Sequence, residues 1–431
     1  MLRRWQTMQR QVYKVALVSM LSFIALTGCQ STGRTVNSGP LLVGPGSAPA
    51  LGTEERHYNY RSNVYLDVVV PVFNPGLPLD NKGQVDYDEI EEENIWPQLR
   101  RAEAKRFAIQ TKRALEDTGA FGNVRVTPTP ATTGDVFVLG TVDYSDSEVV
   151  QLTALVMDSR GKVWGKRQFE HTVSTGFFRD ALNKDKNPYE PVFKQVASYV
   201  YDLLVKRSDA DKRGIQEMTN VRYANYYSPE KFQKYIQTKR VRKSGNIPEH
   251  YEYSLLNVPH ENDAMLKRID ALRVQENMFV DGLQDQYDAF EASTHDSYRM
   301  WQKETLPEAK AAREAQSART TNQVVGGLLT AAAIFGAIKS DSNLEKGLTG
   351  AAAIGALYSF REASNRNEEL HIHRETIDEM GENLDIAIGP QVVEFDDKTY
   401  ELSGTAEEQY EQWKAHLRKI YELEKTPNKQ L

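Results

Sequence analysis

The 431-residue chain contains only one cysteine, Cys29. A single thiol cannot form a disulfide within the chain, so the fold has to be stabilised by packing. The chain also lacks a basic surplus, because 53 Lys and Arg residues stand against 60 Asp and Glu residues. Nucleic-acid binding needs a basic face that replaces the counterions of the phosphates, and the composition does not support this class of function.

Common catalytic motifs are missing as well. The sequence has no G-x-S-x-G, H-E-x-x-H or G-x-x-x-x-G-K motif. His371 and His373 form a close pair, but residues two apart on a predicted helix point about 200° away from each other and cannot bind one metal ion. The acidic run 86–93 lacks the ligand spacing of a calcium loop and is predicted to be a solvated loop. We therefore predict no catalytic residue, no metal site and no cofactor.

The N-terminal residues have the layout of a secretory signal peptide. Four basic residues precede an uncharged, mainly apolar stretch from Val15 to Leu26, which is too short to cross a bilayer as a helix. The stretch ends in a leucine-small-small-cysteine box. The basic residues are Arg3, Arg4, Arg10 and Lys14, and the box is Leu26, Thr27, Gly28 and Cys29.

This segment resembles the bacterial lipoprotein signal. The resemblance implies cleavage before Cys29, a diacylglycerol on its thiol and an acyl chain, such as palmitate, on its amine. Gln30 is a residue other than Asp, which in the enteric sorting rule favours the outer membrane. We expect residues 1–28 to be the signal peptide and the mature protein to be lipid-anchored in the cell outer membrane, facing the periplasm. Removing residues 1–28 removes four basic and no acidic residues, so the formal charge changes from −7 to −11.

Residues 29–60 are rich in Ser, Gly and Pro and are predicted to be a flexible tether. Residues 61–207 are predicted to form an α+β domain with helices on one face of a mainly antiparallel sheet. The predicted strands are 64–70, 135–142, 149–157 and 162–173, with a tight turn at 158–161, and the predicted helices are 97–119 and 191–206.

This domain is similar in pattern to small α+β domains of envelope lipoproteins, namely the auxiliary lipoproteins of lipid-transport ABC systems and the curli-secretion lipoprotein. The likeness lies in the helix end at 115–119, the strand at 134–140 and the hairpin at 157–164. It implies no catalytic or binding residue.

Residues 208–261 are polar and tyrosine-rich and are interpreted as a connector that packs on its neighbours. The connector holds a basic cluster at 239–243. We predict that this cluster is a solvated helix end, and contact with anionic lipid headgroups or glycan is the alternative.

Residues 262–385 are predicted to be a helical, coiled-coil-like region. Apolar residues follow near-heptad steps, which is typical of a packing seam, and polar Glu276 and Thr294 interrupt them. Pro307 is predicted to break or kink the first helix. A second helix over 308–338 and a third from Leu344 through Leu384 are predicted to form an antiparallel hairpin. The seam consists of Met265, Ile269, Leu272, Phe279, Leu283, Tyr287, Phe290, Tyr298 and Trp301.

The predicted hairpin tip, 324–358, has uncharged arms rich in Gly and Ala, and it resembles the glycine-zipper hairpins of other envelope proteins. Glycine costs about 1 kcal/mol against alanine inside a helix, so several glycines imply compensating close contacts. Three alternatives stay open: packing against copies of the chain or a partner, dipping into a membrane, or burial within the fold. The predicted interaction residues are Gly326, Gly327, Gly336, Gly347, Gly350 and Gly355.

Residues 386–431 are predicted to form a small β-hairpin and a final helix. Thr405 and Glu408 have the spacing of a capping box. The apolar stripe of that helix consists of Tyr410, Trp413, Leu417, Ile420 and Tyr421.

The sequence as a whole predicts a membrane-anchored, non-enzymatic scaffold, assembly or transport-accessory protein that associates with itself or with envelope proteins and not with nucleic acid. The alternative is a lipid- or glycan-binding lipoprotein whose helices serve as a stalk. An apolar pocket between the sheet and the helix around Phe107 would favour that alternative, whereas a filled core there would not.

Overall fold

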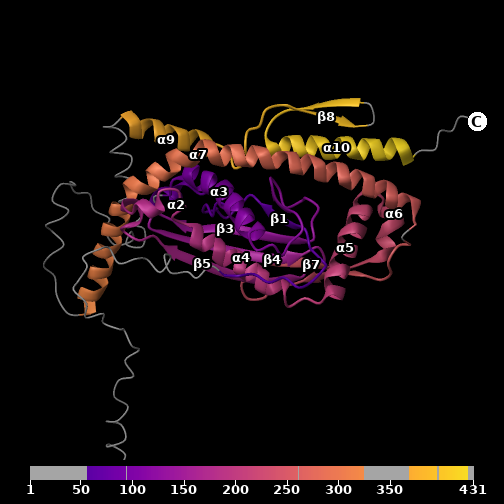
Figure 1. Ribbon diagram of the computed structural model, residues 1–431, viewed down its shortest axis with the longest axis horizontal. Coiled ribbons are helices and arrows are strands. Elements are labelled where there is room, and N and C mark those ends of the chain that lie inside the picture. Colours follow the sequence, from indigo (N-terminus) through magenta and orange to yellow (C-terminus); the bar gives the residue numbers. More distant parts are fainter. Residues whose placement is uncertain (1–55, 94, 261, 325–367, 396–397, 426–431) are drawn as a thin grey trace, which may run out of the picture. The chain divides into compact units, whose positions relative to one another are not determined.

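The computed structural model describes residues 56–93, 95–260, 262–324, 368–395 and 398–425 and contains a five-stranded sheet (Figure 1). The strand order is β2-β1-β3-β4-β5. Strand β1 pairs in parallel with β2 and β3, whereas β3, β4 and β5 are antiparallel. The bounds are β1 Val68–Pro71, β2 Val124–Thr127, β3 Val136–Ser145, β4 Val149–Asp158 and β5 Val163–Thr172.

The predicted strands 135–142, 149–157 and 162–173 are confirmed, and so is the turn between the last two. Gly161 has a φ of 73° in this turn, and the Asp158 carboxylate accepts the N–H of Arg160 at 2.9 Å. The first strand begins at Val68 and not at Val64. Strand β2 was not predicted. It has only four residues, which is too few for a clear alternation of polar and apolar side chains.

Two helices cover one face of the sheet, as predicted. Helix α3, Pro97–Glu116, packs on β1, β2 and β3, and helix α4, Glu190–Leu204, packs on β4 and β5. The ring of Phe107 on α3 lies 5.3 Å from that of Phe193 on α4 and 5.9 Å from that of Tyr189. Phe107, Phe193 and Tyr189 are all buried, so the core around Phe107 is filled by these rings.

The acidic run 86–93 is a short helix, α2 Tyr87–Glu92, and not the predicted loop. The Asp86 carboxylate accepts the N–H groups of Asp88 and Glu89, both at 3.1 Å, and so caps the helix. Ile90 is the buried residue of this helix. Two short 3-10 helices, η2 Phe177–Arg179 and η3 Ala181–Asn183, follow β5.

The predicted connector, 208–261, consists largely of regular elements. Ser208 caps α5 by accepting the N–H of Asp211 at 3.2 Å, and α5 buries an apolar stripe that includes Ile215 and Met218. The basic cluster at 239–243 begins on strand β6 and is therefore not a helix end. The bounds are α5 Asp209–Tyr227, α6 Pro229–Phe232, η4 Gln233–Tyr235, β6 Ile236–Val241 and β7 His250–Leu255.

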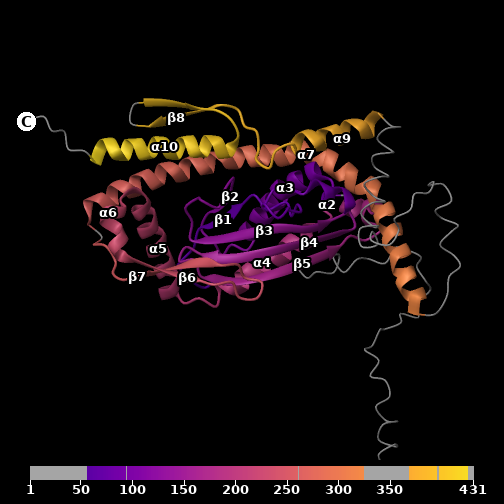
Figure 2. The ribbon, with the colours of Figure 1, turned by 180° about the vertical axis from the view of Figure 1, so that it is seen from behind.

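Helix α7, Ala264–Val324, continues through Pro307, so the proline does not end the helix, and of the two predicted effects, a break or a kink, only the kink remains (Figures 1 and 2). Contacts on both sides of the proline hold the helix together. Thr305, Leu306 and Ala309 are buried, and the Thr305 hydroxyl donates to the carbonyl of Trp301 at 2.7 Å. The views show the helix changing direction along its length, as expected of a helix that contains proline.

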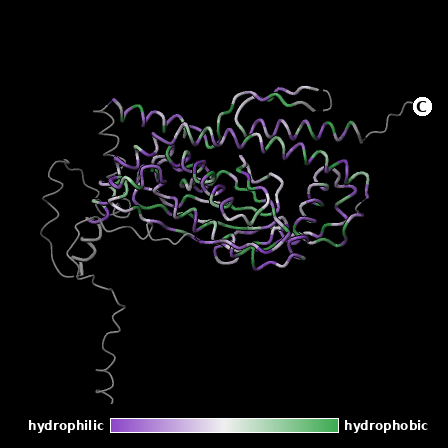
Figure 3. The backbone as a smooth tube through the Cα atoms, viewed as in Figure 1, coloured by the Kyte–Doolittle hydropathy of each residue, from purple (hydrophilic) through white to green (hydrophobic). Residues whose placement is uncertain are grey.

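The predicted seam of α7 is buried except for Met265, which is partly buried. Helix α7 packs on α3 and β2 of the α+β domain, on α5 of the connector, and on the later helices α9 and α10. Polar and apolar residues alternate along α7 and α10 (Figure 3). The seam thus joins the long helix to the domain that precedes it in the sequence.

Helix α9, Glu368–Met380, runs back beside α7 (Figure 2). The Ser297 hydroxyl on α7 lies 3.1 Å from Nδ1 of His373 on α9. The C-terminal elements are those predicted: β8 Gln391–Phe395, β9 Lys398–Leu402 and α10 Ala406–Lys425. The capping box is present, because Thr405 N–H donates to Glu408 at 2.9 Å and Glu408 N–H to Thr405 at 3.3 Å. The fold is mixed α+β, as the sequence predicts.

Candidate functional site

Helix α3 binds the long helix α7 through a buried ion pair. Nη2 of Arg106 lies 3.0 Å from Oε1 of Glu291, and the two side chains are 4% and 7% exposed. The same guanidinium donates to Thr294 Oγ1 at 2.5 Å and lies 4.6 Å from the ring centre of Tyr298. A buried charge needs such compensation, so this arrangement fixes α7 in register on α3.

A buried carboxyl continues this network toward the sheet. Glu103 accepts hydrogen bonds from Ser145 Oγ at 2.6 Å and from Tyr298 OH at 2.9 Å. Burial raises the pKa of the Glu103 carboxyl, while the positive charges of Arg100 and Arg106 oppose that rise. The network joins α3, the end of β3 and α7, and it lies behind the open cleft described next.

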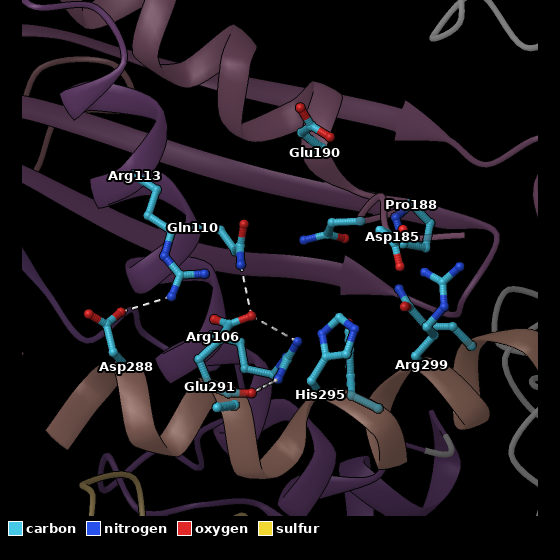
Figure 4. A pocket seen from close by; sticks show the side chains of 14 residues that line it. Arg106, Gln110, Arg113, Asp185, Pro188, Glu190, Asp288, Glu291, His295 and Arg299 are labelled. Atoms are coloured by element: carbon cyan, nitrogen blue, oxygen red, sulfur yellow. Dashed lines mark hydrogen bonds and ion pairs between the residues drawn. The ribbon is translucent and has the colours of Figure 1, made fainter. Parts of the chain in front are cut away.

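A cleft of about 410 Å³ lies between α3, α7 and the segment that precedes α4 (Figure 4). Its volume is within the range of small-molecule sites. Most of its lining is polar or charged. The lining residues are Arg106, Gln110, Arg113, Asp185, Asn187, Pro188, Glu190, Asp288, Glu291, Ala292, His295, Tyr298, Arg299 and Gln302.

The arginines of the cleft already have partners. Besides the Arg106 pair, Arg113 lies 2.8 Å from Asp288, and Arg299 donates to the carbonyls of Lys186 at 2.7 Å and Asn183 at 2.9 Å. Figure 4 shows the Arg113–Asp288 pair at one end and Arg299 at the other, with Glu291 and His295 between them. The lining therefore holds four carboxylates and three guanidiniums, and each guanidinium already has a partner.

Two buried polar atoms of the lining lack hydrogen-bond partners within the described residues. They are Oε2 of Glu291 and Nε2 of Gln302, whose residues are 5% and 1% exposed. The Gln302 side chain lies within hydrogen-bonding reach of the buried Tyr189 hydroxyl. Unpartnered buried polar atoms are uncommon in folded proteins, and a bound ligand is one explanation for them.

Helix α3 also holds the end of α9. Trp96 Nε1 donates to Asp378 at 2.7 Å, and Lys105 Nζ donates to the carbonyls of Met380 at 2.6 Å, Asn383 at 2.8 Å and Asp385 at 3.3 Å. Burial lowers the pKa of Lys105 to about 8. A cation at the C-terminus of a helix is favourable, because the last carbonyls lack partners there.

The part of α7 that follows Pro307 is bound to the sheet. Arg313 pairs with Asp146 and, at 2.8 Å, with Glu148 in the turn between β3 and β4. Lys310 Nζ lies 3.2 Å from Thr175 Oγ1. Earlier on α7, Asp281 pairs with Arg125 of β2 at 2.5 Å. The long helix is therefore bound to the α+β domain at several points along its length.

The predicted site residues lie outside the described residues. These are the box residues Leu26, Thr27, Gly28 and Cys29 and the glycines Gly326, Gly327, Gly336, Gly347, Gly350 and Gly355. Within the described ranges, no helix is both long and apolar enough to span a bilayer.

The histidine pair is divided between two environments. His371 is half exposed with Nδ1 3.5 Å from Glu375, whereas His373 is partly buried with Nδ1 3.1 Å from the Ser297 hydroxyl. In the part of the chain that the structure describes, no group of three or more His, Cys, Asp or Glu residues could hold a metal ion.

The sequence does not reveal that Arg106, Glu291 and Gln302 come together, because their helices are far apart in the chain. One signal was present in the polar interruptions of the α7 seam. Thr294 accepts the hydrogen bond from Arg106, and Glu276 accepts one from Tyr410 OH at 2.7 Å. Each interruption of the apolar pattern is thus a buried polar contact with another element.

Comparisons of the chain with protein-family models, with curated proteins and with solved structures found no match.

Proposed function

We propose that this protein is a lipid-anchored lipoprotein of the bacterial envelope that serves as a non-enzymatic scaffold, assembly or transport-accessory protein. The signal segment that ends at Cys29 supports anchoring in the outer membrane, with the folded body in the periplasm. The glycine-rich composition of residues 325–367 supports self-association or binding of an envelope partner.

The observation that carries this proposal is that α3 holds both helices that flank residues 325–367 in the sequence. Arg106 binds α7 through Glu291, and Lys105 binds the carbonyl of Met380, the last residue of α9, and that of Asn383 just after it. A scaffold benefits from helices that are held in place before a partner binds. The entropy cost of ordering these helices is then met during folding and does not reduce the affinity for the partner.

The anchor is tested by labelling cells with radioactive palmitate. We expect the wild-type chain to incorporate the label into the membrane fraction and Cys29→Ser to incorporate none. An unlabelled, uncleaved wild-type chain in the cytosol would refute the proposal.

Self-association is tested by chemical cross-linking of the lipidated protein in membranes. We expect oligomers whose yield falls in Gly327→Leu and Gly355→Leu. The matched control is Gly282→Leu, because Gly282 is exposed on α7 and an added Cβ would meet nothing within 4 Å. Equal oligomer yields in all variants would exclude the glycine-rich segment from the contact.

A further inference from the structure

The two edges of the five-stranded sheet differ. At one edge, α7 covers β2, because the Gln284 side chain of α7 accepts the N–H of Val126 and donates to its carbonyl, both at 2.9 Å. At the other edge, β5 pairs with β4, and no described strand pairs with its far side (Figures 1 and 2). Strand β5 has 10 residues and no proline, so this edge is long enough to accept a further strand.

The pairing of β5 with β4 determines which backbone groups of β5 point to the open edge. Just beyond β5, Val173 N–H donates to the Glu148 carbonyl at 2.7 Å, and the register is the same along the strand as far as Gly165. In an antiparallel ladder every second residue bonds to the neighbouring strand, so the odd-numbered residues of β5 bond to β4. The even-numbered residues therefore present their N–H and C=O groups at the open edge. They include Lys166, Gln168 and Glu170.

The charges of these residues restrict which strand could pair there. Lys166, Gln168 and Glu170 lie on one face of β5. Gln168 and Glu170 are exposed, and Lys166 is partly buried. Lys166 Nζ donates to the Asn246 carbonyl at 3.0 Å, and Glu170 accepts from Gln151 at 2.7 Å, but an ammonium and a carboxylate can each form further hydrogen bonds. Charges on an edge strand disfavour pairing with an arbitrary strand.

A second copy of β5 matches this charge pattern. When two copies pair antiparallel about a two-fold axis at Gln168, Lys166 of each copy lies opposite Glu170 of the other. An axis at Lys166 would place two lysines opposite each other, and an axis at Glu170 would place two glutamates there. The backbone also fits the Gln168 axis, because the outward N–H and C=O groups of one copy then face those of the other.

We propose that two copies of this protein pair through the open edge of β5, in the antiparallel register centred on Gln168, and so join two five-stranded sheets into one. Such a two-fold contact closes on itself and gives a dimer. The contact goes beyond the proposed function, because it requires neither the lipid anchor nor the glycine-rich segment.

The register is tested by cysteine cross-linking of the purified full-length chain carrying Cys29→Ser, in which an introduced cysteine is the only thiol. Gln168→Cys should give a covalent dimer with a short bismaleimide, because Cβ atoms of directly opposite residues lie about 5 Å apart. Thr172→Cys is the matched control on the same strand, since its two copies would lie roughly 26 Å apart and should not be linked. Absence of the Gln168→Cys dimer, or an equal yield from Thr172→Cys, would overturn the proposal.

The charge pairing is tested in the Gln168→Cys chain by reversing one charge at a time. Lys166→Glu and Glu170→Lys each place like charges opposite each other on both sides of the axis, and each should weaken the dimer by about 10-fold or more. A mixture of the two variants restores opposite charges at both positions, so the mixed dimer should form as it does in the chain with neither change. A mixture that cross-links no better than either variant alone would contradict the proposal.

Two controls separate this contact from other effects. Thermal unfolding of the charge variants is recorded, and recovery of the dimer on mixing shows that a single variant has not simply misfolded. Gly327→Leu, which tests the glycine-rich segment, should leave the Gln168→Cys dimer unchanged. Loss of that dimer in Gly327→Leu would overturn the claim that β5 pairs independently of the segment. Palmitate labelling tests the anchor separately.

Discussion

Lys105 gives the sharpest prediction, because one buried ammonium group holds the end of α9. Its side chain is almost fully buried, and it donates to the carbonyls of Met380, Asn383 and Asp385. Burial lowers its pKa from 10.5 to about 8. That difference corresponds to about 3 kcal/mol of free energy for burying the charge. Hydrogen bonds from a charged donor contribute about 1.5–3 kcal/mol each, so we expect Lys105→Met to lose about 2 kcal/mol of stability near neutral pH.

The pH dependence separates this explanation from a simple loss of contacts. Between the two pKa values the unfolded chain keeps the lysine proton while the folded chain has lost it, so raising the pH favours folding. From about pH 7.5 to about pH 9.5, the stability of wild type relative to Lys105→Met should rise by about 2 kcal/mol. Tyr144, whose pKa is raised by burial, destabilises both chains at high pH and cancels in the difference.

The assay is urea denaturation of both chains across this pH range, together with an NMR titration of the Lys105 side chain. Lys112→Met is the matched control on the same helix, because Lys112 pairs only with Glu116, at 2.9 Å, and should change stability by less than about 0.5 kcal/mol. A pKa for Lys105 above about 10, or a difference between wild type and Lys105→Met that does not change with pH, would refute the reasoning.

Three further predictions concern stability in urea denaturation. Arg106→Met leaves Glu291 buried without its ion-pair partner and should lower the free energy of unfolding by about 3–5 kcal/mol. Changing both residues to Met should cost less than the sum of the two single changes, and additive losses would contradict the coupling between them. Gly381→Ala places a Cβ against the carbonyl of Gln98 and should cost about 1–3 kcal/mol, while Gly389→Ala, with open space around it, should be nearly neutral. Thr405→Ala removes one half of the capping box and should cost about 1 kcal/mol, and an unchanged midpoint would show that the cap is not needed.

The sequence predicts the elements whose signals are local. The antiparallel strands are long and end at clear turns, and the final helix combines an apolar stripe with its own capping box. The connector packs on its neighbours as predicted, but helix α5 within it was not predicted, because its buried face is formed partly by tyrosines such as Tyr223 and Tyr227, which also suit a polar loop. The continuity of α7 at Pro307 depends on burial of its neighbours, which local propensity cannot show.

The candidate cleft was beyond prediction for a related reason. Its walls come from α3, from residues 185–190 and from α7, and only the fold brings them together. On α3 the positions of Arg106 and Gln110 look like a solvated face, because a charged residue on a helix is usually exposed. Arg106 is in fact buried, because it pairs with Glu291. Glu291 lies on another helix, so the sequence of α3 alone does not reveal the pair.

The most direct test of the central claim is hydrogen exchange on the purified full-length protein. If α3 holds both α7 and α9, the amides of α9 should be protected nearly as strongly as those of α3 in wild type and should lose protection in Lys105→Met. Rapid exchange throughout α9 beside a protected α3 would contradict the claim that the α+β domain supports both helices.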